Sequence, residues 1–368
     1  MRIAQLINSL DYGGAEQVVA SLAEVQGGQG DHVRLVCLRG LGPQPVDTRA
    51  LTAAGVQIVQ LEKPPGLHPR TVRRLSEYLR SERIEVVHSH NHIVHHYAVA
   101  AGRVARVGAI VNTLHGTASL LGSSALSRAL FWASCLSGDR VVSVCSAVEA
   151  ILRSSFRFPP SMLKVIDNGI DLTRFLAIAP RPSGEELTFG MIGRLEPVKD
   201  HETLLRAFAL LFKRYPNVHL RLLGDGPIRQ YLQDLARGLS LEGRVHFEGF
   251  SRDTVGFLSK LDAYVVSSRS EGLPLTLLEA MSSSLPVAAT AVGGIPDIMR
   301  RVGCNWLCPP CNPQELAAVM EQVLLAHDRA AQGARNRRAA AEHYSVERMT
   351  RDYNELYRSV LAAKARVR

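Results

Sequence analysis

Two glutamates, Glu271 and Glu279, stand eight positions apart in the segment SSRSEGLPLTLLEAM, residues 267–281. An apolar run precedes the segment and helically spaced apolar residues follow Pro274, so we expect a strand, a turn and a helix. The first N–H groups of such a helix form an anion site because they lack intrahelical partners. A nucleotide diphosphate bound there would leave one carboxylate for sugar hydroxyls and the other for ribose hydroxyls. The alternative is a loop glutamate followed by a solvated helix position.

The elements that must position these carboxylates follow an α/β rhythm. Apolar runs of strand length alternate with helical patterns, which is typical of parallel sheets. The expected strands are residues 2–7, 33–38, 56–61, 85–88, 109–114, 140–144 and 164–166, then 187–192, 218–223, 245–247, 263–266 and 286–290.

A chain of 368 residues is long for one core, so we expect two domains. A Pro-, Ser- and Gly-containing stretch at 180–186 reads as the linker between them. We therefore predict one α/β domain at 1–178, a second at 187–345, and a final helix at 346–368. In open α/β sheets ligands bind at the carboxyl ends of the strands, and two such edges facing one another would form a cleft.

Composition limits the function classes. The net charge of +9 favours an acidic partner, yet no nucleic-acid-binding signature is present, so a phosphorylated substrate or an anionic membrane explains the charge better. No apolar run reaches eighteen residues, and the N-terminus lacks a secretory signal pattern. Six cysteines without a disulfide-framework spacing fit a reducing cytoplasm.

Several further motifs occur together and in order. They are Gly13-Gly14-Ala15-Glu16, His115-Gly116, Ser146-Ala147-Val148, Asn168-Gly169-Ile170-Asp171, Gly193-Arg194 with Lys199, Gly224-Asp225-Gly226-Pro227, and Glu271 with Glu279. With these motifs the chain closely resembles, over essentially its full length, the family 4 retaining glycosyltransferases (glycosyltransferase group 1) of GT-B fold. The resemblance implies two Rossmann-like domains facing each other across a cleft, the first binding the acceptor and the second binding the nucleotide-sugar donor. It also implies that the helix at 346–368 crosses back to the first domain.

The resemblance also implies a role for each motif. Arg194 and Lys199 would clamp the donor's diphosphate, since a planar guanidinium and an ammonium both stabilise the charge of a leaving nucleoside diphosphate. His115 would contact the sugar, and Ser146 would line the cleft. The donor-binding set that the resemblance implies comprises Gly13, Gly14, Gly193, Arg194, Lys199, Gly224, Glu271, Gly272, Leu273, Pro274 and Glu279, with His115, Arg194, Lys199 and Glu271 in the catalytic set.

The implied reaction is front-face substitution with retention of anomeric configuration. A hexosyl group would move from a UDP- or GDP-linked sugar to a glycan or lipid-linked acceptor in polysaccharide, exopolysaccharide or surface-glycan biosynthesis. No Asp-x-Asp motif is evident, so we expect no metal and no further cofactor, with Arg and Lys neutralising the diphosphate. The alternatives are a GT-B storage-polymer synthase or phosphorylase, and a non-catalytic sugar-nucleotide-binding scaffold.

Two clusters invite a metal interpretation. Five histidines lie at 88, 90, 92, 95 and 96, and cysteines lie at 304, 308 and 311. On a strand, His88 and His90 would share one face, whereas His92 and His96 would share a helical one. A polar loop and an ordinary turn are the alternatives, and we favour them because the sequence fixes no further ligand.

A basic amphipathic helix is expected at residues 69–83, with arginines that include Arg70, Arg73 and Arg74. It is either a solvated face or a patch that docks on anionic lipid beside a lipid-linked acceptor, helped by the basic tail with Arg366 and Arg368. We therefore expect a cytoplasmic protein, with the inner face of the plasma membrane as the site of any peripheral contact.

Overall fold

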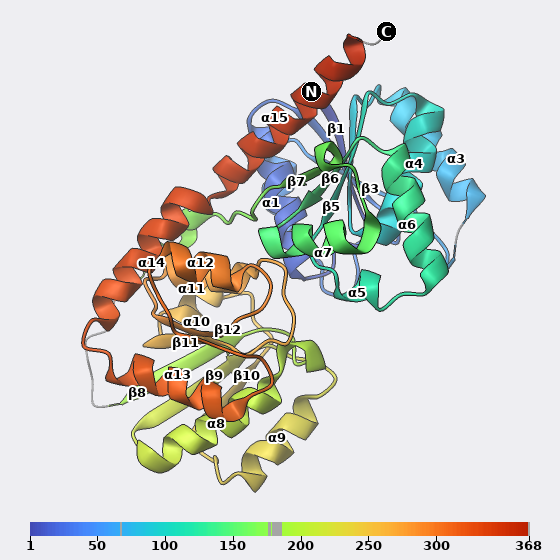
Figure 1. Ribbon diagram of the computed structural model, residues 1–368. Helices are drawn as coiled ribbons and strands as arrows, with labels where there is room; N and C mark the ends of the chain where they lie inside the picture. Colours follow the sequence, from blue (N-terminus) through green and yellow to red (C-terminus); the bar gives the residue numbers. More distant parts are fainter. Residues whose placement is uncertain (67, 176–177, 179–185, 367–368) are drawn as a thin grey trace. The chain divides into compact units, whose positions relative to one another are not determined.

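The computed structural model describes residues 1–66, 68–175, 178 and 186–366. The chain forms two compact units (Figure 1): unit 1 comprises Met1–Ile170 with Val346–Arg368, and unit 2 comprises Asp171–Ser345. The predicted first domain extended to residue 178. Unit 2 begins earlier because the short 3₁₀ helix η2 (Leu172–Phe175) packs on helix α11 of that unit. Apart from Glu186, the predicted linker at 180–186 lies outside the described residues.

Unit 1 contains a seven-stranded parallel sheet of order β3-β2-β1-β4-β5-β6-β7. Its strands are β1 (Arg2–Ile7), β2 (His32–Cys37), β3 (Gln57–Gln60), β4 (Val86–His90), β5 (Ala109–Leu114), β6 (Arg140–Ser143) and β7 (Leu163–Val165). Its helices are α1 (Gly14–Gly28), α2 (Arg49–Ala53), α3 (Pro69–Ser81), α4 (His92–Ala105), α5 (Ala118–Leu121), α6 (Ala125–Ser137), α7 (Ser146–Phe156) and α15 (Val346–Ala365), with the 3₁₀ turn η1 (Pro160–Met162).

Helices cover both faces of this sheet, so the central strands are buried on both sides. Strand β5 is buried throughout, and α4 packs on β4 and β5 with α3 and α6 beside it. Helix α15 packs on α1 and β5, and it brings the buried Tyr353 and Tyr357 to the sheet.

Unit 2 contains a six-stranded parallel sheet of order β10-β9-β8-β11-β12-β13. Its strands are β8 (Leu187–Ile192), β9 (Val218–Leu223), β10 (Val245–Gly249), β11 (Ala263–Val266), β12 (Val287–Thr290) and β13 (Leu307–Cys308). Its helices are α8 (His201–Arg214), α9 (Arg229–Gly238), α10 (Thr254–Leu258), α11 (Leu275–Ser282), α12 (Ile295–Arg301), α13 (Pro313–Leu325) and α14 (Arg329–His343), with the 3₁₀ turn η3 (Pro197–Lys199).

The core of unit 2 forms where α8 and α13 pack on the sheet. Asp200 caps helix α8, because its carboxylate accepts from the backbone N–H of Thr203, and the helix buries Leu204, Leu205 and Phe208. The two parallel sheets confirm the predicted α/β architecture in both halves of the chain. Within the described residues, no helix combines the length and the apolar character needed to cross a bilayer.

Candidate functional site

The loops after neighbouring strands of unit 2 meet backbone to backbone. The N–H of Gly193, after β8, donates to the carbonyl oxygen of Leu223 at the end of β9 (3.0 Å). Gly224 has φ +148°, and a Cβ at that position would lie 1.9 Å from the carbonyl oxygen of Gly193. Only glycine fits this close approach. The structure thus brings the predicted Gly193 and Gly224 together at the carboxyl edge of the sheet.

Lys199 and Glu271 form an ion pair at the same edge. The Lys199 Nζ lies 2.6 Å from Glu271 Oε1, and the Ser268 hydroxyl donates to that same oxygen (2.7 Å). The side chains of Lys199 and Glu271 are 25% and 11% exposed, so bulk water screens the pair only in part. Two donors therefore fix one carboxylate oxygen of Glu271, and its orientation is set before any ligand binds.

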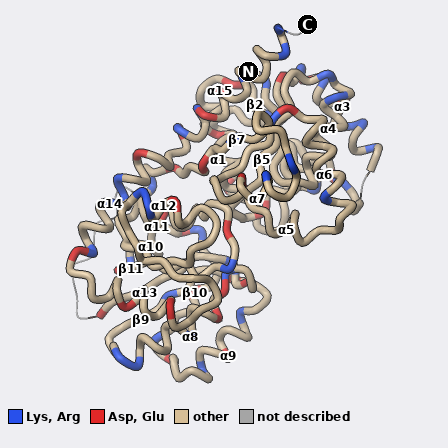
Figure 2. The backbone as a smooth tube through the Cα atoms, in the orientation of Figure 1, with Lys and Arg blue, Asp and Glu red and all other residues tan. Residues whose placement is uncertain are grey.

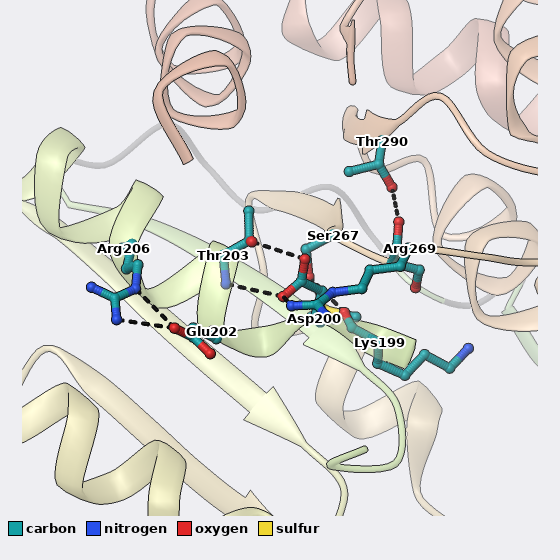
Figure 3. A network of polar contacts seen from close by, with 10 residues as sticks. Lys199, Asp200, Glu202, Thr203, Arg206, Ser267, Arg269 and Thr290 are labelled. Atoms are coloured by element: carbon teal, nitrogen blue, oxygen red, sulfur yellow. Dashed lines mark hydrogen bonds and ion pairs between the residues drawn. The ribbon is translucent and has the colours of Figure 1, made fainter. Parts of the chain in front are cut away.

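A second ion pair joins the same two loops (Figure 3). The Asp200 carboxylate, fully buried, accepts from Arg269 Nη2 (2.9 Å) and from the Thr203 hydroxyl (2.8 Å). The Ser267 hydroxyl donates to the Lys199 carbonyl oxygen (2.9 Å). Burial alone raises the pKa of Asp200, but hydrogen bonds from Arg269 and Thr203 hold it below its ordinary value. Asp200 and Arg269 thus join the loop that carries Lys199 to the loop that carries Glu271.

The loop after β12 supports the Glu271 turn from the other side. The Thr290 hydroxyl donates to the Ser268 carbonyl oxygen (2.7 Å). The backbone N–H of Gly294 donates to the carbonyl oxygen of Gly272 (2.8 Å). Gly293 has φ +56°, and a Cβ there would lie 2.3 Å from the Glu271 carbonyl oxygen. The turn at 268–272 therefore has little room to move.

The helix after this turn carries the second predicted carboxylate. Pro274 is the residue before α11, Leu273 is buried beside it, and Glu279 lies within the helix with 7% exposure. The Glu279 Oε2 atom is buried without a hydrogen-bond partner. Burial raises the pKa of Glu279 to about 7, which Arg174 of η2 opposes. A buried acceptor without a donor is a place where ligand hydroxyls gain full hydrogen bonds.

Arg194 is the predicted residue that the structure places apart from this group. Its Nη2 atom pairs with Glu196 Oε1 (2.8 Å), and its side chain is 65% exposed. The pair is therefore an exposed one on a loop, of small energetic value. Arg194 can change partner at little cost.

In unit 1, Gly13 and Gly14 lie between β1 and α1 as predicted, with Gly13 as the extended residue before the helix. A Cβ at Gly13 would lie 2.4 Å from Glu16 Oε2, whereas one at Gly14 would meet nothing within 4 Å. A Cβ at position 14 would therefore fit without displacing any described atom of the chain. Ser146 is the exposed first residue of α7.

His115 follows β5, and a hydrogen bond to the buried His90 holds its ring. Its Nε2 lies 3.0 Å from His90 Nδ1, while its Nδ1 is buried without a partner. Burial lowers the pKa of His115 to about 4, so the ring is neutral at pH 7.

The five clustered histidines divide between opposite faces of the sheet. His88 and His90 share one face of β4, as their alternate spacing predicts, whereas His92, His95 and His96 lie on α4. The Nδ1 atom of His95 forms a hydrogen bond with the Ser89 hydroxyl (2.9 Å), and the Nδ1 atom of His96 forms one with the Ser134 hydroxyl of α6 (2.8 Å).

The cysteines at 304 and 308 are buried and the one at 311 is exposed. Across the described ranges, no group of three or more His, Cys, Asp or Glu side chains is arranged to hold a metal ion.

Sequence reasoning missed four residues of the unit 2 site: Ser268, Asp200, Arg269 and Arg174. Asp200 carried a signal, because an Asp directly before a helical pattern is a helix cap. Arg269 and Arg174 carried none, since their roles come from contacts with segments distant in sequence, whereas Ser268 contacts Glu271 within the same turn.

Comparison with known proteins adds family evidence. Residues 12–174 match the family described as Glycosyltransferase Family 4, and residues 177–340 match Glycosyl transferases group 1. The chain is 30% identical over 300 residues to a glycogen synthase of Mycobacterium tuberculosis, covering 78% of this chain and 69% of that one.

Other relatives are covered less completely. A lipopolysaccharide core biosynthesis glycosyltransferase, LpsE of Rhizobium meliloti, is 32% identical over 203 residues, which are 54% of this chain and 58% of LpsE. An uncharacterized glycosyltransferase of Methanocaldococcus jannaschii is 32% identical over 150 residues, 39% of this chain and 37% of that one. The chain thus spans well under two thirds of these two relatives.

Among solved structures, Anabaena Alr3699/HepE in complex with UDP superimposes with a TM-score of 0.82 at 20% identity, covering 98% of this chain and 100% of HepE. At this identity the likeness establishes the fold alone.

Proposed function

Because the chain belongs to the family 4, group 1 glycosyltransferases, we propose that it moves a hexosyl group from a UDP- or GDP-linked sugar to a glycan or lipid-linked acceptor, with retention of configuration. The observation that carries the proposal is the Lys199–Glu271 pair, with the Ser268 hydroxyl as a second donor to Glu271. It places a cation and an oriented carboxylate side by side, next to the two glycine loops.

The site residues divide the work of the proposed reaction. Lys199, with Arg194 released from Glu196, stabilises the negative charge that grows on the departing diphosphate. Glu271 accepts hydrogen bonds from hydroxyls of the transferred sugar, and the unpartnered Glu279 oxygen accepts them from ribose. The leaving phosphate oxygen takes the proton of the incoming acceptor hydroxyl on the same face of the sugar. These two cations supply the positive charge, so we expect turnover to continue in EDTA.

Relatives support the class of donor and acceptor. HepE has been crystallised with UDP and with UDP-glucose, and LpsE is named for lipopolysaccharide core biosynthesis. We therefore propose a nucleotide sugar as co-substrate without another cofactor, and a lipid-linked surface glycan as the acceptor. The glycogen synthase relative favours a second candidate, extension of a storage glucan. Measuring sugar transfer to a glucan primer and to a lipid-linked acceptor distinguishes these two candidate functions.

Thermal-shift binding tests the donor site first. We would measure UDP, GDP, ADP, UDP-glucose and GDP-mannose against wild type, Lys199→Ala and, as a control, Lys213→Ala on the exposed side of α8. We expect one diphosphate to stabilise wild type and Lys213→Ala by mass action but not Lys199→Ala. If none of the five raises the melting temperature of wild type, the proposed donor site is wrong. Binding without turnover would instead favour the scaffold.

Peripheral membrane contact is part of the proposal, and two sets of side chains support it. Arg70, Arg73 and Arg74 are exposed on α3, where Figure 2 shows basic residues gathered, although Arg74 also donates to the Leu61 carbonyl oxygen (3.2 Å). Helix α6 presents an outward apolar stripe. Its exposed large side chains are Leu126, Leu130, Trp132 and Leu136. Helix α4 packs against both α3 and α6.

An apolar stripe beside arginines suits the inner, anionic leaflet of a plasma membrane. Flotation with vesicles containing anionic lipid tests this. We expect salt-sensitive binding that Leu126→Asp with Leu130→Asp abolishes and Arg70→Glu with Arg73→Glu weakens. Equal recovery with neutral and anionic vesicles at every salt concentration would contradict the membrane contact.

A further inference from the structure

Unit 1 contains a polar network inside its apolar core. Gln5 on β1, His88 and His90 on β4, and Thr113 on β5 are fully buried, and α15 covers them with Tyr353 and Tyr357. Buried polar groups persist only when they are hydrogen bonded, so each contact constrains the positions of the protons.

The proton positions can be followed from one end of the network. The Gln26 amide nitrogen donates to Asn354 Oδ1 (2.8 Å), and Gln26 Oε1 accepts from Gln5 Nε2 (2.9 Å). Gln5 Oε1 then faces His90 Nε2 (2.9 Å). An amide oxygen only accepts, so the proton of neutral His90 is on Nε2.

His90 in turn determines the state of His115. With its proton on Nε2, His90 has a lone pair on Nδ1, which lies 3.0 Å from His115 Nε2. The His115 proton must therefore be on Nε2, and the His115 Nδ1 lone pair is left without a partner. The two rings are in direct contact, with centroids 5.3 Å apart and planes 28° apart, which restricts rotation of His115.

Reversing every amide in the network would reverse this result. Gln5 would then donate to His90, and His115 would carry its proton on Nδ1, a buried N–H with no acceptor. Orphaned buried N–H groups are rarer in proteins than unfilled acceptor lone pairs. The first arrangement is therefore the favoured one, and both rings are neutral because burial lowers the pKa of His90 and His115.

We propose that His90 is a positioning residue that holds His115 in the Nε2–H tautomer, so that His115 Nδ1 accepts a hydrogen bond from a substrate hydroxyl. The substrate contact rests on the proposed glycosyltransferase activity, whereas the tautomer does not. Gln5 orients His90 in the same way. The network thus connects α15, through Asn354, Gln26 and Gln5, to the ring that follows β5.

Ring-nitrogen NMR of the full-length protein labelled with ¹⁵N-histidine tests the tautomer directly, with His115→Gln to assign the signal. We expect the Nε2–H form at pH 7 in the absence of substrate. An Nδ1–H form or a doubly protonated ring would overturn the proposal, whether or not the protein shows any transferase activity.

Two variants of similar shape separate positioning from packing. His90→Asn places an amide oxygen near the former Nδ1, whereas His90→Leu offers His115 no acceptor, and both lose the Gln5 contact. We expect His90→Asn to keep the tautomer and His90→Leu to lose it, with about a tenfold larger loss of kcat in His90→Leu and little change in donor KM. His96→Asn, on the other face, is the control for loss of a histidine.

Equal tautomers and equal kcat in the Asn and Leu variants would contradict a positioning role for His90. Circular dichroism melting of the full-length variants identifies any that has failed to fold, and the wild-type NMR measurement stands even then.

Discussion

Glu279 is a carboxylate whose surroundings disfavour its charge. It is buried, its Oε2 atom lacks a donor, and its pKa rises to about 7. Because the folded state binds this proton more tightly than the unfolded state, the contribution of Glu279 to stability is greatest below the unfolded pKa near 4.5. It is lost as the pH rises through 7.

The corresponding prediction compares wild type with Glu279→Gln at two pH values. The amide cannot ionise, so at pH 8 we expect the variant to be more stable than wild type by about 1–3 kcal/mol, with the difference vanishing near pH 4. Hydrogen exchange of the unit 2 amides, followed as a function of urea concentration, measures this difference in stability. Glu242→Gln, at an exposed position, is the control. A pH-independent difference would show that the Glu279 pKa is not raised.

The elements of unit 2 place Glu271 through contacts between loops. Arg269 joins the buried Asp200, whereas Arg206 pairs with Glu202 on the open surface of α8 (Figure 3). Removing one partner of a buried pair leaves a charge unsatisfied, while an exposed pair contributes little.

We therefore expect Arg269→Ala to destabilise unit 2 by about 1–3 kcal/mol, less than for a fully buried pair because the guanidinium is half-exposed. The matched Arg206→Ala should cost less than about 1 kcal/mol. Since Asp200 adjoins Lys199, turnover should also fall in Arg269→Ala alone. Hydrogen exchange and initial rates measure the two effects. Equal losses in both variants would remove any special role for the buried pair.

A second prediction at this scale concerns the loop after β12. Gly293→Ala introduces a Cβ into the Glu271 carbonyl and a side chain at φ +56°. We expect nucleotide affinity to fall at least about tenfold as the turn is displaced. Gly238→Ala, where a Cβ meets nothing, should leave affinity unchanged. Isothermal titration calorimetry with the diphosphate found by thermal shift measures both affinities. An unchanged affinity in Gly293→Ala would contradict the prediction.

Elements were easier to predict than their contacts. Strands β5 and β8 were predicted to the residue, since apolar runs report burial on both faces of a sheet. Strand β4 was predicted to end at His88 but continues to His90, because polar side chains lie inside the core there. Sequence spacing does not show that Gln5, Thr113 and Tyr357 form hydrogen bonds with those histidines. Such a network depends on which elements pack together.

At the scale of the molecule, the chain order and the folded units do not coincide. Helix α15 follows unit 2 in sequence but belongs to unit 1, where the large side chains that it buries are Met349, Tyr353, Leu356, Tyr357 and Val360. Each such side chain contributes about 1.5–3 kcal/mol by burial. Their sum is comparable with the whole stability of a typical domain, about 5–15 kcal/mol.

Unit 1 is therefore incomplete until the last residues of the chain are present. A chain that ends at Ser345 keeps every residue of unit 2 and loses α15 entirely. We expect the amides of β1, β4 and β5 to lose hydrogen-exchange protection in this truncation, because Gln5, His88 and Thr113 would lose their partners on α15. The amides of β8 and β11 should keep theirs, and the thermal shift by nucleotide should persist. A chain ending at Lys364, which retains the Lys364–Asp139 pair, is the control. Full protection of β1 and β4 in the shorter chain would mean that residues 1–170 fold without α15.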